Sequence, residues 1–472
     1  MAHHTMADNV AAIGFSRVAA LALDGLAYVV LARYLGPTPY GQYITIFAFL
    51  SLIDLAADMM TLDVSVREIA ASPERTSTWL TAATVVRMAL ACVGLAAFGL
   101  YAAWTGIARD PATSTAAIVA ALLLPVGALR MPLVAFRAHM RMHYELAIIV
   151  AVRAINLVLL FAVAVAGAML WALFAATLAS RALLAILAWR IAVREFGFRP
   201  VFELEAVRRL IRESLPMGVS GLCVAAQLKG DIMLVGAMIG AHAAGLYGVV
   251  AQLPEYLLYV PVIFTTPALP MLSRAIADGG TRDFQRLYQG MFDTVMSIVI
   301  PIAVLGIIVP QPLVEWMFGA AYAPAAAVLP LLMLSVVCMW FSHAVAVATV
   351  AARLQSHFIW IQAVCVGVFF ALNAWLIPIW GVTGAAVARL AAAAIAPALT
   401  YALLRYRVGV TLSTRVLRQS AIAAAAMAAG VALMSSQPAV IIGVVGMTVY
   451  AAVLWMTGSN PFASLVQEEI PT

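Results

Sequence analysis

The residues of this chain that could do chemistry are ionisable side chains placed inside long apolar stretches. A charged side chain at the centre of a bilayer costs about 2.5–3.5 kcal/mol on insertion scales, so each one calls for a partner or a function. The basic members are more frequent in the first half of the chain and the acidic members in the second. They are Arg17, Arg87, Arg130, Arg153, Arg181, Lys229 and Arg389, with Asp24, Asp54, Asp58, Asp231, Glu255, Asp293 and Glu315.

Arginines occupy four successive apolar stretches at similar depth. Arg87, Arg130, Arg153 and Arg181 each lie about 10–15 Å from the same end of their stretch, at about 1.5 Å per residue. At one depth they could form a cationic belt, and guanidinium groups match phosphate oxygens bidentately. The alternative is that these long side chains snorkel to the headgroups.

Arg17 and Lys229 are better-placed candidates for the same belt. Lys229 lies near the middle of its apolar stretch, where snorkelling is hardest, and it is the only lysine of the chain. We therefore expect Lys229 to face a central cavity.

The acidic residues suggest ion coupling. Asp54 and Asp58 are four residues apart and share one helix face, and a tight hairpin would bring them near Asp24. They could couple transport to protons or sodium, or they could be structural ion-pair partners for the arginines. Asp231 and Asn373 are further coupling candidates, and with Thr383 they could offer oxygen ligands to sodium.

Composition identifies an all-α, polytopic membrane protein. The 472 residues are 65% hydrophobic and 10% charged, which no soluble fold could accommodate. Apolar runs of about twenty residues predict about fourteen spans. Their predicted centres are Gly25, Ser51, Leu90, Leu124, Val158, Ala182, Ala226, Val260, Ile302, Val337, Val368, Ala393, Met427 and Val449.

The loops alternate in positive charge. Loops with arginine fall on one side of the predicted membrane, apart from Arg33 and Arg109, so the positive-inside rule places both termini in the cytoplasm. The arginines occupy short loops and spans, and nucleic acid is therefore not an expected partner. The charged segment at residues 194–212 is predicted to be a cytoplasmic amphipathic connector.

One short turn occurs twice. The stretch from Leu35 to Tyr43 has the pattern apolar-Gly-four residues-Gly-one residue-Tyr, and the stretch from Ile239 to Tyr247 repeats it. Each copy joins two predicted spans, which indicates two similar halves related by a parallel repeat. We predict an N-terminal lobe of six spans (1–193), the connector, a C-terminal lobe of six spans (213–407), and two further spans with a tail (408–472).

Several segments resemble the polysaccharide flippases of the multidrug/oligosaccharidyl-lipid/polysaccharide exporter superfamily. The resemblance covers roughly residues 10–405, in order. Met59 and Met60 depart from it, since they replace residues that are usually small. The matching segments are Leu31 to Gly41, Asp58 with Val66 to Ala70, Asp231, Gly240 to Tyr247, Pro267 to Arg274, Pro301, Phe318 to Tyr322 with Ala326, and Gly381 to Ala386.

The resemblance implies two six-helix lobes around a cavity that opens alternately to each side. The implied cargo is an oligosaccharide on undecaprenyl or another polyprenyl diphosphate, flipped from the cytoplasmic to the periplasmic leaflet of the bacterial inner membrane for O-antigen, lipopolysaccharide or related surface polysaccharide biosynthesis. Its diphosphate would bind Arg17, Arg87, Arg130, Arg153 and Lys229. Membrane lipids, a polysaccharide polymerase and a chain-length regulator are the candidate partners of what we expect to be a monomer.

Three alternatives remain open. The first is a cation-coupled multidrug-type antiporter, whose cationic cargo would favour acidic rather than basic side chains. The second is a lipid II flippase, since that group shares the architecture. The third is a membrane enzyme such as a polymerase or glycosyltransferase, which is disfavoured by the short outward loops and by the lack of a catalytic constellation. We expect no enzyme activity, no cofactor and no resident metal other than the sodium considered above.

Overall fold

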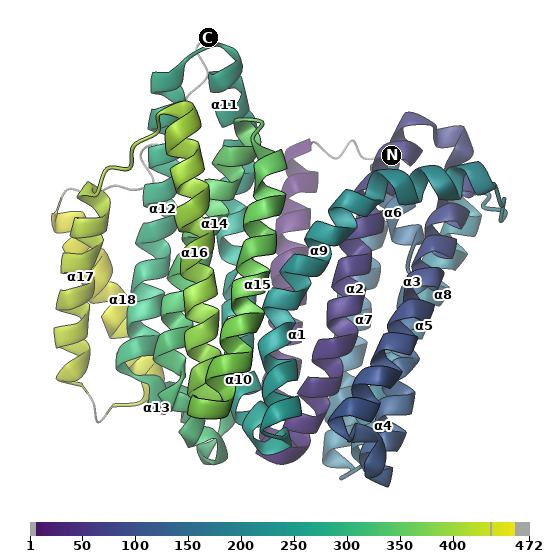
Figure 1. The fold of residues 1–472 in the computed structure, drawn as a ribbon, viewed down its shortest axis with the longest axis horizontal. Helices are drawn as coiled ribbons and strands as arrows, with labels where there is room; N and C mark the ends of the chain where they lie inside the picture. The colour runs from purple at the N-terminus through teal and green to yellow at the C-terminus, as the bar shows by residue number, and fades with distance from the viewer. Residues whose placement is uncertain (1–5, 435–436, 458–472) are drawn as a thin grey trace. The chain divides into compact units, whose positions relative to one another are not determined.

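The chain is helical almost throughout. The computed structural model describes residues 6–434 and 437–457 (Figure 1), and these contain no strand. The predicted all-α class is therefore confirmed. The side chain of Arg17 lies outside the described part of the structure.

The helices are long enough to cross a bilayer. Within the described residues, 12 helical segments combine sufficient length with sufficient hydropathy, which makes this a multi-pass membrane protein. Every predicted span centre lies in a helix. The two predicted spans beyond these 12 correspond to α1 (Met6–Leu35) and α17 (Arg415–Ala432).

The chain divides into two compact units, and the boundary between them lies after Gly245. The sequence-based lobe boundaries stay a prediction, but packing groups the helix from Leu204 with the helices that precede it. The remaining elements of the first unit are α2 (Pro37–Ala71), η1 (Pro73–Arg75), α3 (Thr76–Thr105), η2 (Ile107–Arg109), α4 (Pro111–Ala121), α5 (Leu123–Ala128), α6 (Pro132–Ala138), α7 (Met142–Val165), α8 (Leu170–Phe196) and α9 (Leu204–Met238).

The second unit takes most of α10 (Ala241–Leu257) and the rest of the chain. Helices α12, α14 and α16 form its centre, and α17 and α18 pack together on α12. Its elements after α10 are α11 (Tyr259–Ala277), α12 (Thr281–Ile308), α13 (Pro310–Phe318), η3 (Ala320–Ala327), α14 (Leu329–Ala351), α15 (Gln355–Trp380), α16 (Val382–Val408), α17 and α18 (Ala439–Met456).

The repeated turn joins α1 to α2 and α9 to α10. Its first glycine has a positive φ in both copies, 70° at Gly36 and 115° at Gly240. L-residues with a side chain rarely adopt such values, so glycine permits the chain reversal here. The sequence interpretation of these glycines as turn-forming residues is confirmed.

Prolines interrupt the span that was predicted around Leu124. Pro125 and Pro132 lack the backbone N–H that a continuous helix needs, and the span breaks into α4, α5 and α6. The second break, between Ala128 and Pro132, contains Arg130. This break matters because it sets the position of a charged side chain deep in the unit.

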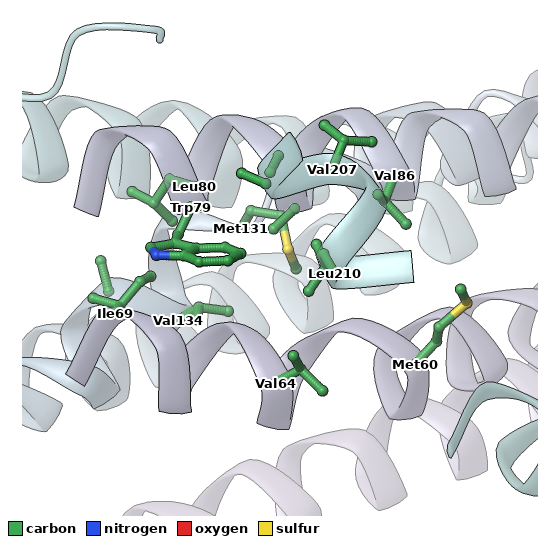
Figure 2. Packing of buried hydrophobic residues seen from close by; sticks show 14 residues of the cluster. Met60, Val64, Ile69, Trp79, Leu80, Val86, Met131, Val134, Val207 and Leu210 are labelled. Atoms are coloured by element: carbon green, nitrogen blue, oxygen red, sulfur yellow. The ribbon is translucent and has the colours of Figure 1, made fainter. Parts of the chain in front are cut away.

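The first turns of α9 dock on the ends of the neighbouring helices. Val207 and Leu210 point into a buried cluster with Trp79 and Leu80 of α3, Val64 of α2, and α6 residues (Figure 2). Farther along, α9 contains Pro216 and bends, then runs beside α2 (Figure 1). Most of the predicted 194–212 connector is therefore helical; only 197–203 separates α8 from α9.

Candidate functional site

Two carboxylates on α2 form the centre of a charged network in the first unit. Asp54 and Asp58 are one helical turn apart and contact the same guanidinium group, that of Arg87 on α3. Arg87 Nη2 donates to Asp54 Oδ1 at 2.9 Å, and its Nη1 donates to Asp58. The Arg87 side chain is only 1% exposed. The shared helix face that was predicted for the two aspartates is confirmed by this common partner.

Two further arginines complete the network. Arg130, in the break between α5 and α6, donates to Asp54 Oδ1 at 3.1 Å and to Asp58. Arg181 of α8 donates to Asp54 Oδ2 at 3.2 Å. Three guanidinium groups thus face two carboxylates, which leaves one excess positive charge when all five groups are ionised.

The five groups differ in their exposure. The side chains of Arg130 and Arg181 are each 29% exposed, and that of Asp58 is 22% exposed. Arg87 is buried behind them. Arg130 and Arg181 are therefore the members of the network that an anionic ligand could reach, while Arg87 neutralises the carboxylates from the protein interior.

A glycine allows α5 to approach the network. A Cβ at Gly127 would lie 3.3 Å from Asp54 Oδ1 and 3.5 Å from Arg181 Nη1. A cavity of about 10 Å³, close to the space that one water centre needs, adjoins Asp54 and Arg87. Sequence reasoning did not single out Gly127; its position between Pro125 and Pro132 in a broken span was the available signal.

Arg153 does not join this network. It lies on α7 and forms an ion pair with Asp24 of α1, and its Nη1 donates to the carbonyl of Ala20 at 3.3 Å. Both partners are more than one third exposed. The structure therefore divides the predicted belt into a central group of three arginines and a separate Arg153–Asp24 pair.

Lys229 and Asp231 are buried on α9. Asp231 is fully buried, and its Oδ1 accepts a hydrogen bond from the backbone N–H of Ile232 at 2.8 Å. Two residues along, the carbonyl of Met233 accepts a hydrogen bond from Tyr101 of α3 at 3.1 Å. The roles predicted for Lys229 in cargo binding and for Asp231 in ion coupling stay predictions.

The other predicted sodium ligands lie in the second unit. Asn373 is fully buried on α15 and donates to the carbonyl of Phe369 at 2.8 Å. Thr383 lies in the first turn of α16 and is exposed. Among the described residues, no cluster of three or more His, Cys, Asp or Glu side chains could hold a metal. The sodium site, which would also use an amide and a hydroxyl, stays a prediction.

A second ion-pair network lies at the end of α2 that is remote from Gly36. Buried Glu68 accepts hydrogen bonds from Arg67 at 3.2 Å and from Arg209 of α9. Arg67 and Arg209 also pair with Glu213 of α9. No sequence pattern predicted this pairing, because charged residues at span ends are common. It links α2 to the first turns of α9.

The family model for polysaccharide biosynthesis proteins matches residues 30–327, which is more than half of the chain. The chain belongs to this family. The resemblance that was drawn from the sequence is thereby confirmed. No curated protein sequence matches the chain.

Solved structures with the same fold are transporters of the multidrug/oligosaccharidyl-lipid/polysaccharide exporter superfamily. This chain is similar to the lipid II flippase MurJ in an inward closed conformation (TM-score 0.75, 13% identity, 97% of this chain and 99% of that one). It is also similar to an inward-facing multidrug resistance MATE family transporter (TM-score 0.67, 14% identity, 82% and 94%). A third is a transporter of this superfamily from Pyrococcus furiosus (TM-score 0.59, 14% identity, 85% and 96%). At these identities the similarity establishes the fold alone.

Proposed function

We propose that this protein flips a polyprenyl-diphosphate-linked oligosaccharide from the cytoplasmic to the periplasmic leaflet of the bacterial inner membrane, by alternating access. The membership of the polysaccharide biosynthesis family supports a role in surface polysaccharide assembly. The multi-pass helical fold supports a transporter rather than an enzyme. In this proposal both termini are cytoplasmic, and polymerase and chain-length regulator act on the product.

The observation that carries the cargo class is the excess positive charge of the network formed by Asp54, Asp58, Arg87, Arg130 and Arg181. An anionic diphosphate entering the site would meet Arg130 and Arg181, the partly exposed members. It would compete with Asp54 and Asp58 for these guanidinium groups, which bind phosphate oxygens in a bidentate geometry. A site selected for cationic drugs would present an excess of carboxylates instead.

The same network supports a role for the aspartates. When cargo phosphate binds the arginines, Asp54 and Asp58 lose part of their counter-charge, which favours uptake of a proton. Coupling of cargo binding to protonation would follow. The structure holds the aspartates in ion pairs, so their structural and coupling roles are compatible within one cycle.

The direct test is reconstitution into proteoliposomes. Fluorescent polyprenyl-diphosphate-linked oligosaccharide is expected to become accessible in the opposite leaflet only when the protein is present. Lipid II and a cationic dye serve as the alternative cargoes in parallel vesicles. Transport of the dye without the lipid-linked oligosaccharide would replace our proposal by a multidrug-type antiporter, and preference for lipid II would reassign the cargo.

A further inference from the structure

One stretch of the second unit carries only positive charge. Between Glu315 and Glu468 the chain has no acidic residue. Four arginines of this stretch flank the loop between α16 and α17, and all of them are exposed: Arg405, Arg407, Arg415 and Arg418. Within the described residues, none of the four forms an ion pair. The ends of α16 and α17 therefore form a basic patch for which this part of the chain provides no counter-charge.

The loop between α16 and α17 (Figure 1), residues 409–414, is held by two glutamines of α12, and we call it the strap. Gln285 accepts a hydrogen bond from the N–H of Thr411 at 2.9 Å and donates to the carbonyl of the same residue. One helical turn further, Gln289 accepts from the N–H of Ser413 at 2.8 Å and donates to its carbonyl at 3.2 Å.

The spacing of these contacts explains why they fit. Residues two apart in an extended segment lie about 6.6 Å apart and point to the same side. Residues four apart on a helix are separated by a rise of about 6 Å. The two glutamine side chains therefore bind the backbone of the strap much as a neighbouring β-strand would.

Three further contacts fix the strap. The N–H of Leu412 donates to the hydroxyl of Tyr401 on α16 at 3.1 Å, and the side chain of Val410 is buried. The amide nitrogen of Gln289 also donates to Asp293 Oδ1 at 2.7 Å, which orients this amide toward the strap. The arginines at both ends of the strap are thus attached to a rigid segment.

The basic patch lies at the level of lipid headgroups. α17 contains 18 residues, which span about 27 Å, close to the thickness of a hydrocarbon core. Arg415 and Arg418 lie in its first turn, which contains no acidic residue, and this positive end of the helix dipole favours an anion. Tyr406, next to Arg407, is 84% exposed, which is typical of tyrosines at a membrane interface.

We propose that the four arginines and the strap form a binding site for the phosphate group of an anionic phospholipid. Guanidinium groups bind phosphate oxygens in a bidentate geometry, and the strap fixes their spacing. A zwitterionic headgroup would bring its own cation beside the arginines, so the patch is complementary to an anionic one. A bound lipid would hold the end of α17, which packs with α18 on α12. The inference goes beyond the proposed function and does not depend on it.

Lipid titration tests the site. The detergent-solubilised protein is titrated with fluorescent phosphatidylglycerol and, in parallel, with fluorescent phosphatidylcholine. Arg407→Gln with Arg415→Gln should weaken phosphatidylglycerol binding by about tenfold, because two of the four charges are lost from an exposed surface. Arg190→Gln with Arg194→Gln removes two exposed arginines of α8 and is the matched control. Equal phosphatidylglycerol affinities of the two double variants would overturn the site.

A variant that keeps every arginine separates a defined site from general charge attraction. Gln285→Ala with Gln289→Ala releases the strap, so phosphatidylglycerol should bind about threefold more weakly as the arginines lose their fixed spacing. Gln311→Ala, whose native amide donates to Glu315 at 2.8 Å on α13, is the control. Unchanged affinity in the Gln285/Gln289 variant would show that the strap is not part of the site.

The same titration distinguishes other occupants. Inorganic phosphate at the concentration of the lipid should not displace phosphatidylglycerol; displacement would replace the lipid site by one for a soluble anion. Equal binding of phosphatidylglycerol and phosphatidylcholine would contradict the proposal and leave an acidic segment of a partner protein as the candidate occupant. Because no cargo is present, failure of the protein to flip a lipid-linked oligosaccharide would refute the proposed function without affecting this site.

Discussion

Arg87 of α3 donates to Asp54 of α2 across 2.9 Å while its side chain is only 1% exposed. A buried guanidinium in a membrane protein requires such a counter-charge, and Asp58 provides a second one. Arg87 with its two aspartates therefore forms the buried, structural part of the network. Arg130 and Arg181 form its outer, partly exposed part.

Removal of the inner arginine should destabilise the protein. Arg87→Ala leaves Asp54 and Asp58 without their buried partner, and breaking a buried ion pair costs about 3–5 kcal/mol. Because Arg130 and Arg181 still face the aspartates, we expect the free energy of unfolding to fall by about 3 kcal/mol, the low end of this range. Denaturant titration in detergent measures it. Arg190→Ala, at an exposed position, is the control. An Arg87→Ala protein as stable as Arg190→Ala would exclude the structural role.

Changes to the outer arginine should affect transport more than folding. Arg130→Lys keeps the charge but loses the planar, bidentate geometry, so we expect flipping to fall by about tenfold. Flipping by the Arg130→Ala variant should fall further. Stability of both variants should remain near that of the parent, because Arg87 still neutralises the aspartates. Normal flipping by Arg130→Lys would show that Arg130 does not hold the diphosphate bidentately.

The docked start of α9 should depend on its buried face. Leu210 is fully buried in the cluster with Trp79, whereas the next residue, Ile211, is 40% exposed. Leu210→Ala removes packed methyl groups and should lower the free energy of unfolding by about 2–5 kcal/mol. Ile211→Ala is the neighbouring control and should change stability much less. Equal losses in the two variants would mean that the cluster in Figure 2 does not stabilise the first turns of α9.

Acidification should lower the stability of the protein through His139, which lies in the loop between α6 and α7. Its Nε2 lies 2.9 Å from Thr76 Oγ1 and its ring stacks on Phe196. Burial, together with the nearby Arg141 cation, lowers the pKa of His139 below its ordinary value of 6.5. The unfolded chain therefore binds a proton at this histidine at a higher pH than the folded chain does. The contribution of His139 to stability is complete above about pH 6.5, the ordinary pKa of histidine, and is lost as the pH falls through the lower pKa of the folded state.

The measurement is the melting temperature of the detergent-solubilised protein from pH 7.5 to pH 5.5. We expect it to fall with pH in the parent and to fall less in His139→Gln, which cannot be protonated. Matching slopes in the two proteins would rule out His139 as the group responsible.

The helices and turns could be predicted from the sequence. Apolar runs of about twenty residues have few folding options in a bilayer other than a helix, so each predicted centre, such as Ser51 or Ala182, lies in one. The similar depth of Arg87, Arg130 and Arg181 in the membrane could also be predicted from their positions in the apolar stretches. What periodicity could not provide was the rotation of each helix about its axis, which decides whether an arginine meets Asp54 or, like Arg153, meets Asp24.

Met59 and Met60 illustrate the same limit. In the sequence they are departures from a family pattern of small residues; in the structure they pack against Gly218 and Gly221 of α9. The volume added on one helix is accommodated by glycines on the other. This compensation joins residues far apart in the chain, and no local pattern contains it.

The sequence by itself determined that this protein is a bundle of membrane helices with a duplicated glycine turn, because hydropathy, length and positive φ are local requirements. Only the tertiary structure decided which charges neutralise one another and that the two turns cross at their second glycines. Those outcomes depend on helix rotation, on the break around Arg130 and on backbone approach, which are set by packing between distant segments.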